Sequence, residues 1–90
     1  MTPLQKRDYL TGALAAREFL RRMQSELRVH RQFLPQTLRW EFACAVGLHV
    51  PEYRAGFLDA IGAYLLTTLE GVLVDPNRWE VLDLLEWEEN

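Results

Sequence analysis

Residues 51–73 are the stretch that most constrains how this chain can fold. They include ten large apolar side chains that, at helical spacing, cover most of a helix circumference. A helix that is apolar on most sides is normally buried by neighbours on several sides. Small residues such as Gly56 and Ala60 would let those neighbours approach closely. We therefore predict a long central helix over about 51–73, with Ile61 and Leu65 in the core.

Prolines divide the chain into four segments that we expect to be helical. They stand at positions 3, 35, 51 and 76, and proline is well tolerated at the first position of a helix. A strand is the alternative for the last segment, where W-E-V-L-D-L-L-E-W-E partly alternates, but a single strand would have nothing to pair with. The predicted fold is all-α, a compact bundle of four helices in a single domain, 1–90. The expected helices run from residue 3 to between 29 and 32, from about 36 to 46, over 51–73, and from 76 to about 87.

Local signals support the first and last of these helix starts. Thr2 and Gln5 have the spacing of a capping box, in which each side chain bonds a backbone N–H of the other residue. Asp75 is a strong N-cap residue before Pro76. Val74 and Trp79 occupy the two positions of a hydrophobic staple, which predicts that Trp79 packs on its own domain.

Composition indicates a folded, water-soluble chain. Hydrophobic residues make up 49% of its 90 residues and charged residues 26%, which is ordinary for a globular domain. No stretch has the eighteen or so uncharged apolar residues that a membrane span needs, and the N-terminus lacks a signal-peptide pattern. We expect a cytoplasmic protein without a membrane association.

Residues suited to catalysis are few and scattered. Ser25 is the single serine, and His30 and His49 fall in different segments. Cys44 is the single cysteine and is expected to be a buried thiol, the alternative being a reactive one. Neither a metal-ligand spacing nor a glycine-rich phosphate loop is present. We predict no enzyme, no catalytic residue, no metal site and no cofactor.

Charge is distributed unevenly along the chain. Residues 1–32 carry seven basic and three acidic side chains, a net charge of +4, whereas residues 51–90 carry two basic and nine acidic ones, a net charge of −7. This split predicts internal pairing, head-to-tail association or a charged partner. The basic side chains of the first helix are concentrated on one face, either as a solvated surface or as a strip that binds carboxylates. The strip residues are Arg17, Arg21, Arg28 and Arg31.

The last predicted helix has more apolar surface than one small core can cover. Leu84 and Trp87 point away from the face that contains Trp79. Either this helix lies in a groove between the first and third helices, or its second face contacts another protein. We include Leu84 and Trp87 with the arginine strip as predicted partner-binding residues.

The segment 36–60 resembles a helix-turn-helix. Ala43 stands four residues before Gly47, followed by a short apolar turn and a further helix. The resemblance implies a DNA-binding regulator. However, the expected recognition helix begins with Glu52 and contains Asp59, where base and phosphate contacts favour basic or amide side chains. The basic residues left for this alternative are Arg28, Arg31 and Arg54.

These patterns favour a small, acidic, non-enzymatic protein–protein interaction module. We expect it to bind another protein and also itself, as a homodimer, and we do not expect a nucleic-acid partner. Chains of this size and charge often act as adaptors or stoichiometric inhibitors, including accessory proteins that phages use against host machinery. The helix-turn-helix DNA-binding regulator is the alternative.

Overall fold

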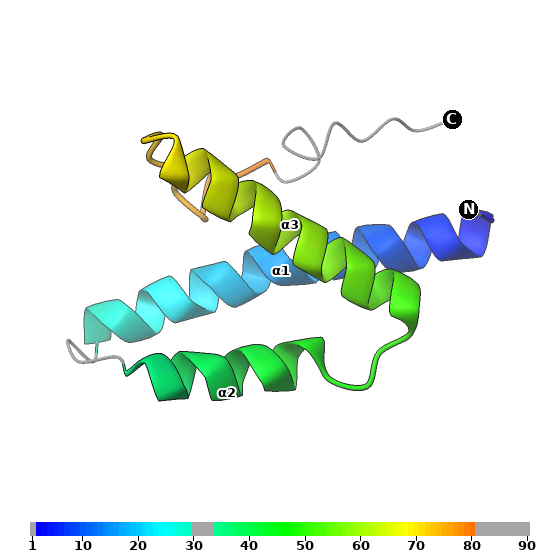
Figure 1. Cartoon of the computed structure of the whole chain (residues 1–90), viewed down its shortest axis with the longest axis horizontal. Coiled ribbons are helices and arrows are strands. Elements are labelled where there is room, and N and C mark those ends of the chain that lie inside the picture. Colours follow the sequence, from blue (N-terminus) through cyan, green and yellow to red (C-terminus); the bar gives the residue numbers. More distant parts are fainter. Residues whose placement is uncertain (1, 30–33, 81–90) are drawn as a thin grey trace.

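The computed structural model describes residues 2–29 and 34–80, which form three α-helices and no strand (Figure 1). The helices are α1 (Pro3–Val29), α2 (Pro35–Val46) and α3 (Pro51–Leu69). Helix α3 crosses the face of α1, and α2 runs back beside the C-terminal half of α1 (Figure 1). The prediction of an all-helical chain is confirmed for these residues, whereas the prediction of a four-helix bundle is wrong.

Each of the three helices begins at a proline, as predicted. At the start of α1, the backbone N–H of Thr2 donates to Oε1 of Gln5 at 2.8 Å, and the N–H of Gln5 donates to Oγ1 of Thr2 at 3.1 Å. These two bonds form the predicted capping box and satisfy donors that the first turn leaves unpaired.

The helices α1 and α3 touch backbone to backbone where they cross. A Cβ atom built on Gly12 would lie 2.0 Å from the carbonyl oxygen of Tyr53, and one built on Gly56 would lie 2.0 Å from the carbonyl oxygen of Tyr9. Neither position can hold a larger residue without the helices moving apart. The two glycines therefore set the distance between α1 and α3.

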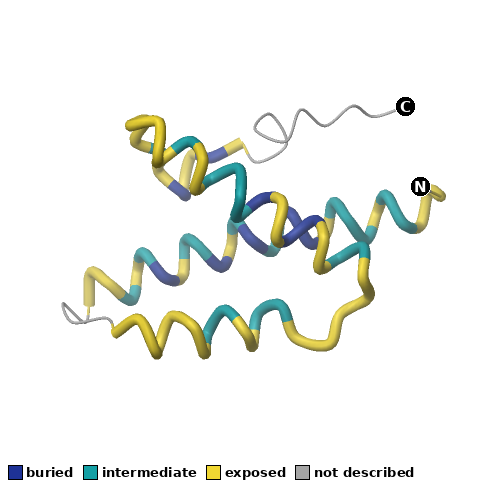
Figure 2. Tube along the Cα trace, viewed as in Figure 1, coloured by how far each residue is buried: buried dark blue, intermediate teal, exposed yellow. Residues whose placement is uncertain are grey.

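The core surrounds this crossing, where the buried residues of both helices face each other (Figure 2). Phe57 of α3 is 1% exposed, and burying such a side chain contributes about 1.5–3 kcal/mol. Its ring lies 5.8 Å from that of Phe19 and 5.7 Å from that of Phe42, measured between centroids. The buried apolar residues are Ala13, Ala16, Phe19, Met23, Phe57, Ala60 and Trp79.

A hydrogen bond ties the two helices together beside the crossing. The hydroxyl of Tyr9 donates to Oδ2 of Asp59 at 2.6 Å. Burial of the hydroxyl, together with this bond and the negative charge of Asp59, raises the pKa of Tyr9 to about 12. The phenol therefore stays protonated well above its usual titration range.

Residues 75–80 do not begin the predicted fourth helix. They form a turn at 76–78 followed by non-helical backbone. A helix starting at Pro76 would use the carbonyls of Pro76 and Asn77 to accept bonds from N–H groups four residues on. Instead, both carbonyls accept hydrogen bonds from the guanidinium of Arg21, at 3.1 Å each. The rest of the predicted helix, 81–87, lies outside the described residues.

Helix α3 is shorter and less enclosed than predicted. It ends at Leu69 rather than near 73, because Gly71 has a φ of 88° and the N–H of Val72 bonds back to the carbonyl of Thr67, as in a Schellman motif. Leu65, predicted to lie in the core, is 53% exposed. The prediction that α3 has neighbours on several sides is therefore wrong, since its buried residues are confined to one face.

Helix α2 is attached more loosely than the other two. None of its residues is buried, and it reaches the core mainly through the partly buried residues Phe42, Ala45 and Val46. Cys44, predicted to be buried, is exposed. Within the F-A-C-A-V run, Phe42, Ala45 and Val46 pack against the core, whereas Cys44 lines an open hollow between α1, α2 and the start of α3.

The close crossing yields a matched pair of substitutions. Gly12→Ala should destabilise the protein by about 1–3 kcal/mol or more, because its Cβ would overlap the backbone of α3. Gly62→Ala should be neutral or stabilising by up to about 1 kcal/mol, because a Cβ there meets no atom within 4 Å and alanine favours helix. Chemical denaturation of both variants measures the two changes. Equal stabilities for Gly12→Ala and the wild type would contradict the crossing.

Candidate functional site

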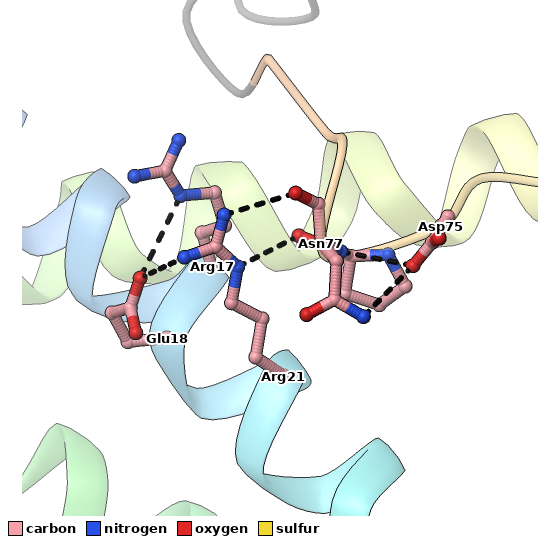
Figure 3. A network of polar contacts seen from close by, with 6 residues as sticks. Arg17, Glu18, Arg21, Asp75 and Asn77 are labelled. Carbon is pink, nitrogen blue, oxygen red and sulfur yellow. Dashed lines mark hydrogen bonds and ion pairs between the residues drawn. The ribbon is translucent and has the colours of Figure 1, made fainter.

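Two residues of the arginine strip, Arg17 and Arg21, lie at the turn that follows α3 (Figure 3). The guanidinium of Arg21 donates from Nε to the carbonyl of Pro76 and from Nη2 to the carbonyl of Asn77, and its Nη1 donates to Oε1 of Glu18 at 2.7 Å. Three of its donors are thus used inside the chain. Arg21 serves to hold the 75–79 segment against α1.

Arg17 lies next to this network and is less completely paired. Its Nε is shielded from solvent and makes no hydrogen bond within the described residues, and it lies 3.8 Å from Oε1 of Glu18, too far for a hydrogen bond. The two terminal nitrogens of Arg17 point away from Glu18 and Arg21 (Figure 3). Arg17, whose side chain is 25% exposed, therefore lies beside the anchored turn without contributing to its hydrogen bonds.

The turn is organised by its own side chains. Oδ1 of Asp75 accepts hydrogen bonds from the backbone N–H of Asn77 at 3.0 Å and from its side-chain Nδ2 at 3.1 Å. The backbone bond is the largest cause that lowers the pKa of Asp75. Nδ2 of Asn77 also donates to Oε1 of Gln24 on α1 at 3.0 Å. Asp75 is thus a turn former here, and not the cap of a longer helix within the described part.

Behind this turn, Trp79 is fixed in the core, as predicted. It is 3% exposed, and its ring packs edge-on against Tyr64 with the centroids 5.4 Å apart. The hydroxyl of Tyr64 donates to the carbonyl of Val74 at 3.4 Å. The segment that returns from α3 is therefore held both by Arg21 and by the buried indole.

The predicted partner-binding residues fall into three groups. Arg17 and Arg21 come together at the turn. Arg28 is exposed in the last turn of α1, seven residues beyond Arg21, and its positive charge is one of the causes that lower the pKa of Asp75 in the turn. Arg31, Leu84 and Trp87 lie outside the described residues.

Residues 36–60 contain two helices joined by a short link, as in the helix-turn-helix resemblance. The basic residues of that alternative are far apart, however. Tyr53 touches α1 at Gly12, so Arg54 is near that point, whereas Arg28 lies sixteen residues further along α1, about 24 Å at the helical rise. Arg28 and Arg54 therefore do not form one compact basic patch.

An extensive apolar surface remains uncovered on α2 and α3 of the described chain (Figure 2). On α2, Trp40 is 68% exposed, and on α3, Leu69 is 81% exposed. An apolar groove of about 380 Å³ runs between these helices and α1, with Leu38 and Phe42 on one wall and Leu65 on the other. The large apolar residues exposed on α2 and α3 are Leu38, Trp40, Leu58, Leu65, Leu66 and Leu69.

A second, more polar hollow of about 590 Å³ lies between α1, α2 and the start of α3. Arg22 and Glu41 form an ion pair across it at 3.4 Å, and Cys44 lies on its wall.

Within residues 2–29 and 34–80, no group of three or more His, Cys, Asp or Glu residues is placed to hold a metal ion. In the same residues, no helix combines the length and apolar character required to cross a membrane.

The apolar outer face of α3 is the feature that the sequence analysis interpreted wrongly. Leu58, Leu65 and Leu69 were counted as core because they belong to an apolar helix. Their spacing of seven and four residues was the available signal, since it places them on one face of a helix, on the side away from Ala60.

Family models, curated proteins and solved structures were compared with the chain, and none of them matches it.

The neighbouring arginines of α1 provide a test of the anchored turn. Arg21→Ala should lower the free energy of unfolding by about 1–2 kcal/mol, because two backbone carbonyls lose a charged donor. Arg22→Ala should change it by less than about 0.5 kcal/mol, because Arg22 forms an exposed ion pair with Glu41. Urea denaturation measures both. If the two variants are equally stable, Arg21 does not hold the turn.

Proposed function

We propose that this chain is a small, non-enzymatic, cytoplasmic protein–protein interaction module that binds itself and a second protein. In that role it would act as an adaptor or a stoichiometric inhibitor. Its working surfaces would be the exposed apolar faces of α2 and α3, with exposed arginines of α1 contributing charge.

The single observation that carries the proposal is the exposed apolar face of α3. Leu58, Leu65, Leu66 and Leu69 are all about half exposed or more, and no charged residue lies between Asp59 and Glu70. A surface helix of a monomeric protein normally has a polar outer face. Large contiguous apolar patches on a soluble protein usually mark a contact with another protein.

The adjoining surface of α2 supports the same interpretation. Leu38 and Phe42 of α2 line the groove that Leu65 of α3 borders, and Leu38 is exposed. A partner lying over α3 could therefore also contact α2. The exposed Trp40 lies on the opposite side of α2 from this groove, and tryptophan is among the residues that contribute most binding energy at protein interfaces.

Charge supports a carboxylate-bearing partner. Arg28 is exposed and Arg17 is half-buried on α1, while the C-terminal half of the chain carries a net charge of −7. A second copy or another acidic protein would supply complementary charge. The overall net charge of −3 makes nucleic acid a poor partner, because phosphate binding favours a basic surface.

The proposal can be tested with the purified full chain. Sedimentation velocity over a range of concentrations should give a mass above the 10.5 kDa of the monomer. Affinity capture from extracts of its native cells should recover a partner in a fixed ratio. Arg28→Glu should weaken capture most at low salt, because added salt screens exposed charges.

Arg7→Glu is the matched control, since it makes the same charge change at an exposed residue in the other half of α1. A chain that stays monomeric at every concentration and captures no partner would overturn the proposed function. Equal effects of the two charge reversals would remove Arg28 from the binding surface and leave the apolar faces as the proposed contact.

A further inference from the structure

We propose that two copies of this chain associate through the outer face of α3, with the two α3 helices packed side by side and parallel. This inference rests on the proposed function and names the surface by which the chain binds itself. The contact face, here called the α3 seam, consists of Ala55, Leu58, Gly62, Leu65 and Leu69.

The α3 seam lies opposite the face that packs on α1. At 100° per residue, its five residues fall within about 80° of one another, and the middle of this strip is about 170° from the middle of the buried face. That buried face is formed by Gly56, Phe57 and Ala60. Helix α3 is therefore apolar on two opposite sides, and the described chain covers only one of them.

The spacing of the α3 seam is that of a helix-packing surface. Its residues recur at intervals of three, four, three and four, which is the a/d pattern of a coiled coil. Small residues at Ala55 and Gly62 alternate with leucines at Leu58 and Leu65, and a Cβ on Gly62 would meet no atom within 4 Å. Such an alternation lets the leucines of one helix pack beside small residues of another. The matching partner is therefore a helix.

The flanking residues indicate that this partner helix is a second copy. Arg54 and Asp59 stand at the g and e positions beside the α3 seam, as do Ile61 and Leu66. In a parallel pair of identical helices, a g residue lies beside the e residue five positions on in the other copy. Arg54 would therefore face Asp59, and Ile61 would face Leu66.

Both of these contacts are complementary in the parallel pair, one in charge and one in apolar character. In an antiparallel pair centred on Gly62, Asp59 would face Leu66 and Arg54 would face Thr68, which leaves both charges unmatched. Tyr9 donates to Oδ2 of Asp59, so Arg54 of the other copy would bind Oδ1.

The size of the surface sets the expected strength of the dimer. Helix α3 has 19 residues and is about 28 Å long, so the seam alone gives an interface at the small end, below about 1,200 Å² in total. The adjoining groove, with Leu38 and Phe42 of α2 on its far wall, extends it. We therefore expect a dimer that dissociates on dilution rather than a permanent one.

The first experiment measures the mass of the full chain by sedimentation velocity. The double variant Leu58→Glu with Leu65→Glu should weaken dimerisation by at least about a hundredfold, because each dimer would bury unpaired carboxylates. The helical circular dichroism and the melting temperature of the diluted monomer should stay near wild type, since both leucines are half exposed. Leu48→Glu is the control, because Leu48 is fully exposed and lies off α3.

The second experiment leaves the leucines of the α3 seam intact. In a Cys44→Ser background, Ala55→Cys should form a disulfide-linked dimer under mild oxidation, because a parallel pair places each Ala55 beside its own copy, within the reach of a disulfide. Leu48→Cys in the same background is the control and should link much more slowly. In an antiparallel pair Ala55 would instead face Leu69, and A55C would not link.

A wild-type dimer that persists in the L58E/L65E variant overturns the α3 seam and leaves the proposed function standing. In that case, loss of the dimer in Leu84→Ala with Trp87→Ala would move the contact to the C-terminal residues. A wild type that is monomeric at all concentrations overturns self-association, and the α3 seam is then covered by residues 81–90 or by another protein. Absence of the A55C link in a wild-type-like dimer overturns the parallel pairing.

Discussion

The backbone contacts of Gly12 with Tyr53 and of Gly56 with Tyr9 are the constraint on which the rest of this structure depends. Each glycine lies directly against a carbonyl of the opposite helix, so α1 and α3 approach too closely for a side chain at either position. This closeness brings Phe19 and Phe57 into contact and buries Ala13, Ala16 and Ala60 in the same core. A core made of so few large side chains is stable because the spaces between its elements are small.

The same contact determines which surfaces stay exposed. Because α1 occupies one face of α3, and the segment around Trp79 closes the space beside Tyr64, the opposite face of α3 has no cover within the described residues. Helix α2 packs at the edge through a few aromatic and small residues and leaves Trp40 in solvent. The stability of the crossing and the availability of an apolar contact surface therefore have one cause.

Much of the local structure could be predicted from the sequence, because it depends on neighbouring residues. The proline starts, the Thr2–Gln5 capping box and the burial of Trp79 follow from short-range chemistry. The position of Leu65 could not be predicted in this way. The pattern of an apolar helix indicates that most of its faces are covered. It does not indicate whether the covering residues belong to the same chain or to a partner. The predicted helix start at Pro76 was wrong, and the sequence did not reveal that Arg21, more than fifty residues away, binds the carbonyls of Pro76 and Asn77.

The predicted interaction residues likewise include features that the sequence could predict and features that it could not. Arg17 and Arg21 were grouped correctly by helical spacing, but the sequence did not reveal that Arg21 has an internal role. Arg28 remains on the surface, while Arg31, Leu84 and Trp87 are outside the described residues. In the sequence, the residues of the α3 seam recur at intervals of three and four, which places them on one face of the helix. This face was nevertheless assigned to the core because α3 as a whole is apolar.

The central claim is the glycine-to-carbonyl crossing of α1 and α3, and nuclear Overhauser spectroscopy of the dilute, isotope-labelled chain tests it most directly. The account predicts cross-peaks from the Hα protons of Gly12 to the Hα of Tyr53, and from those of Gly56 to the Hα of Tyr9. Backbone protons give such peaks only when the two helices touch without intervening side chains. Assigned spectra that lack both cross-peaks, while the three helices are present, would contradict the account.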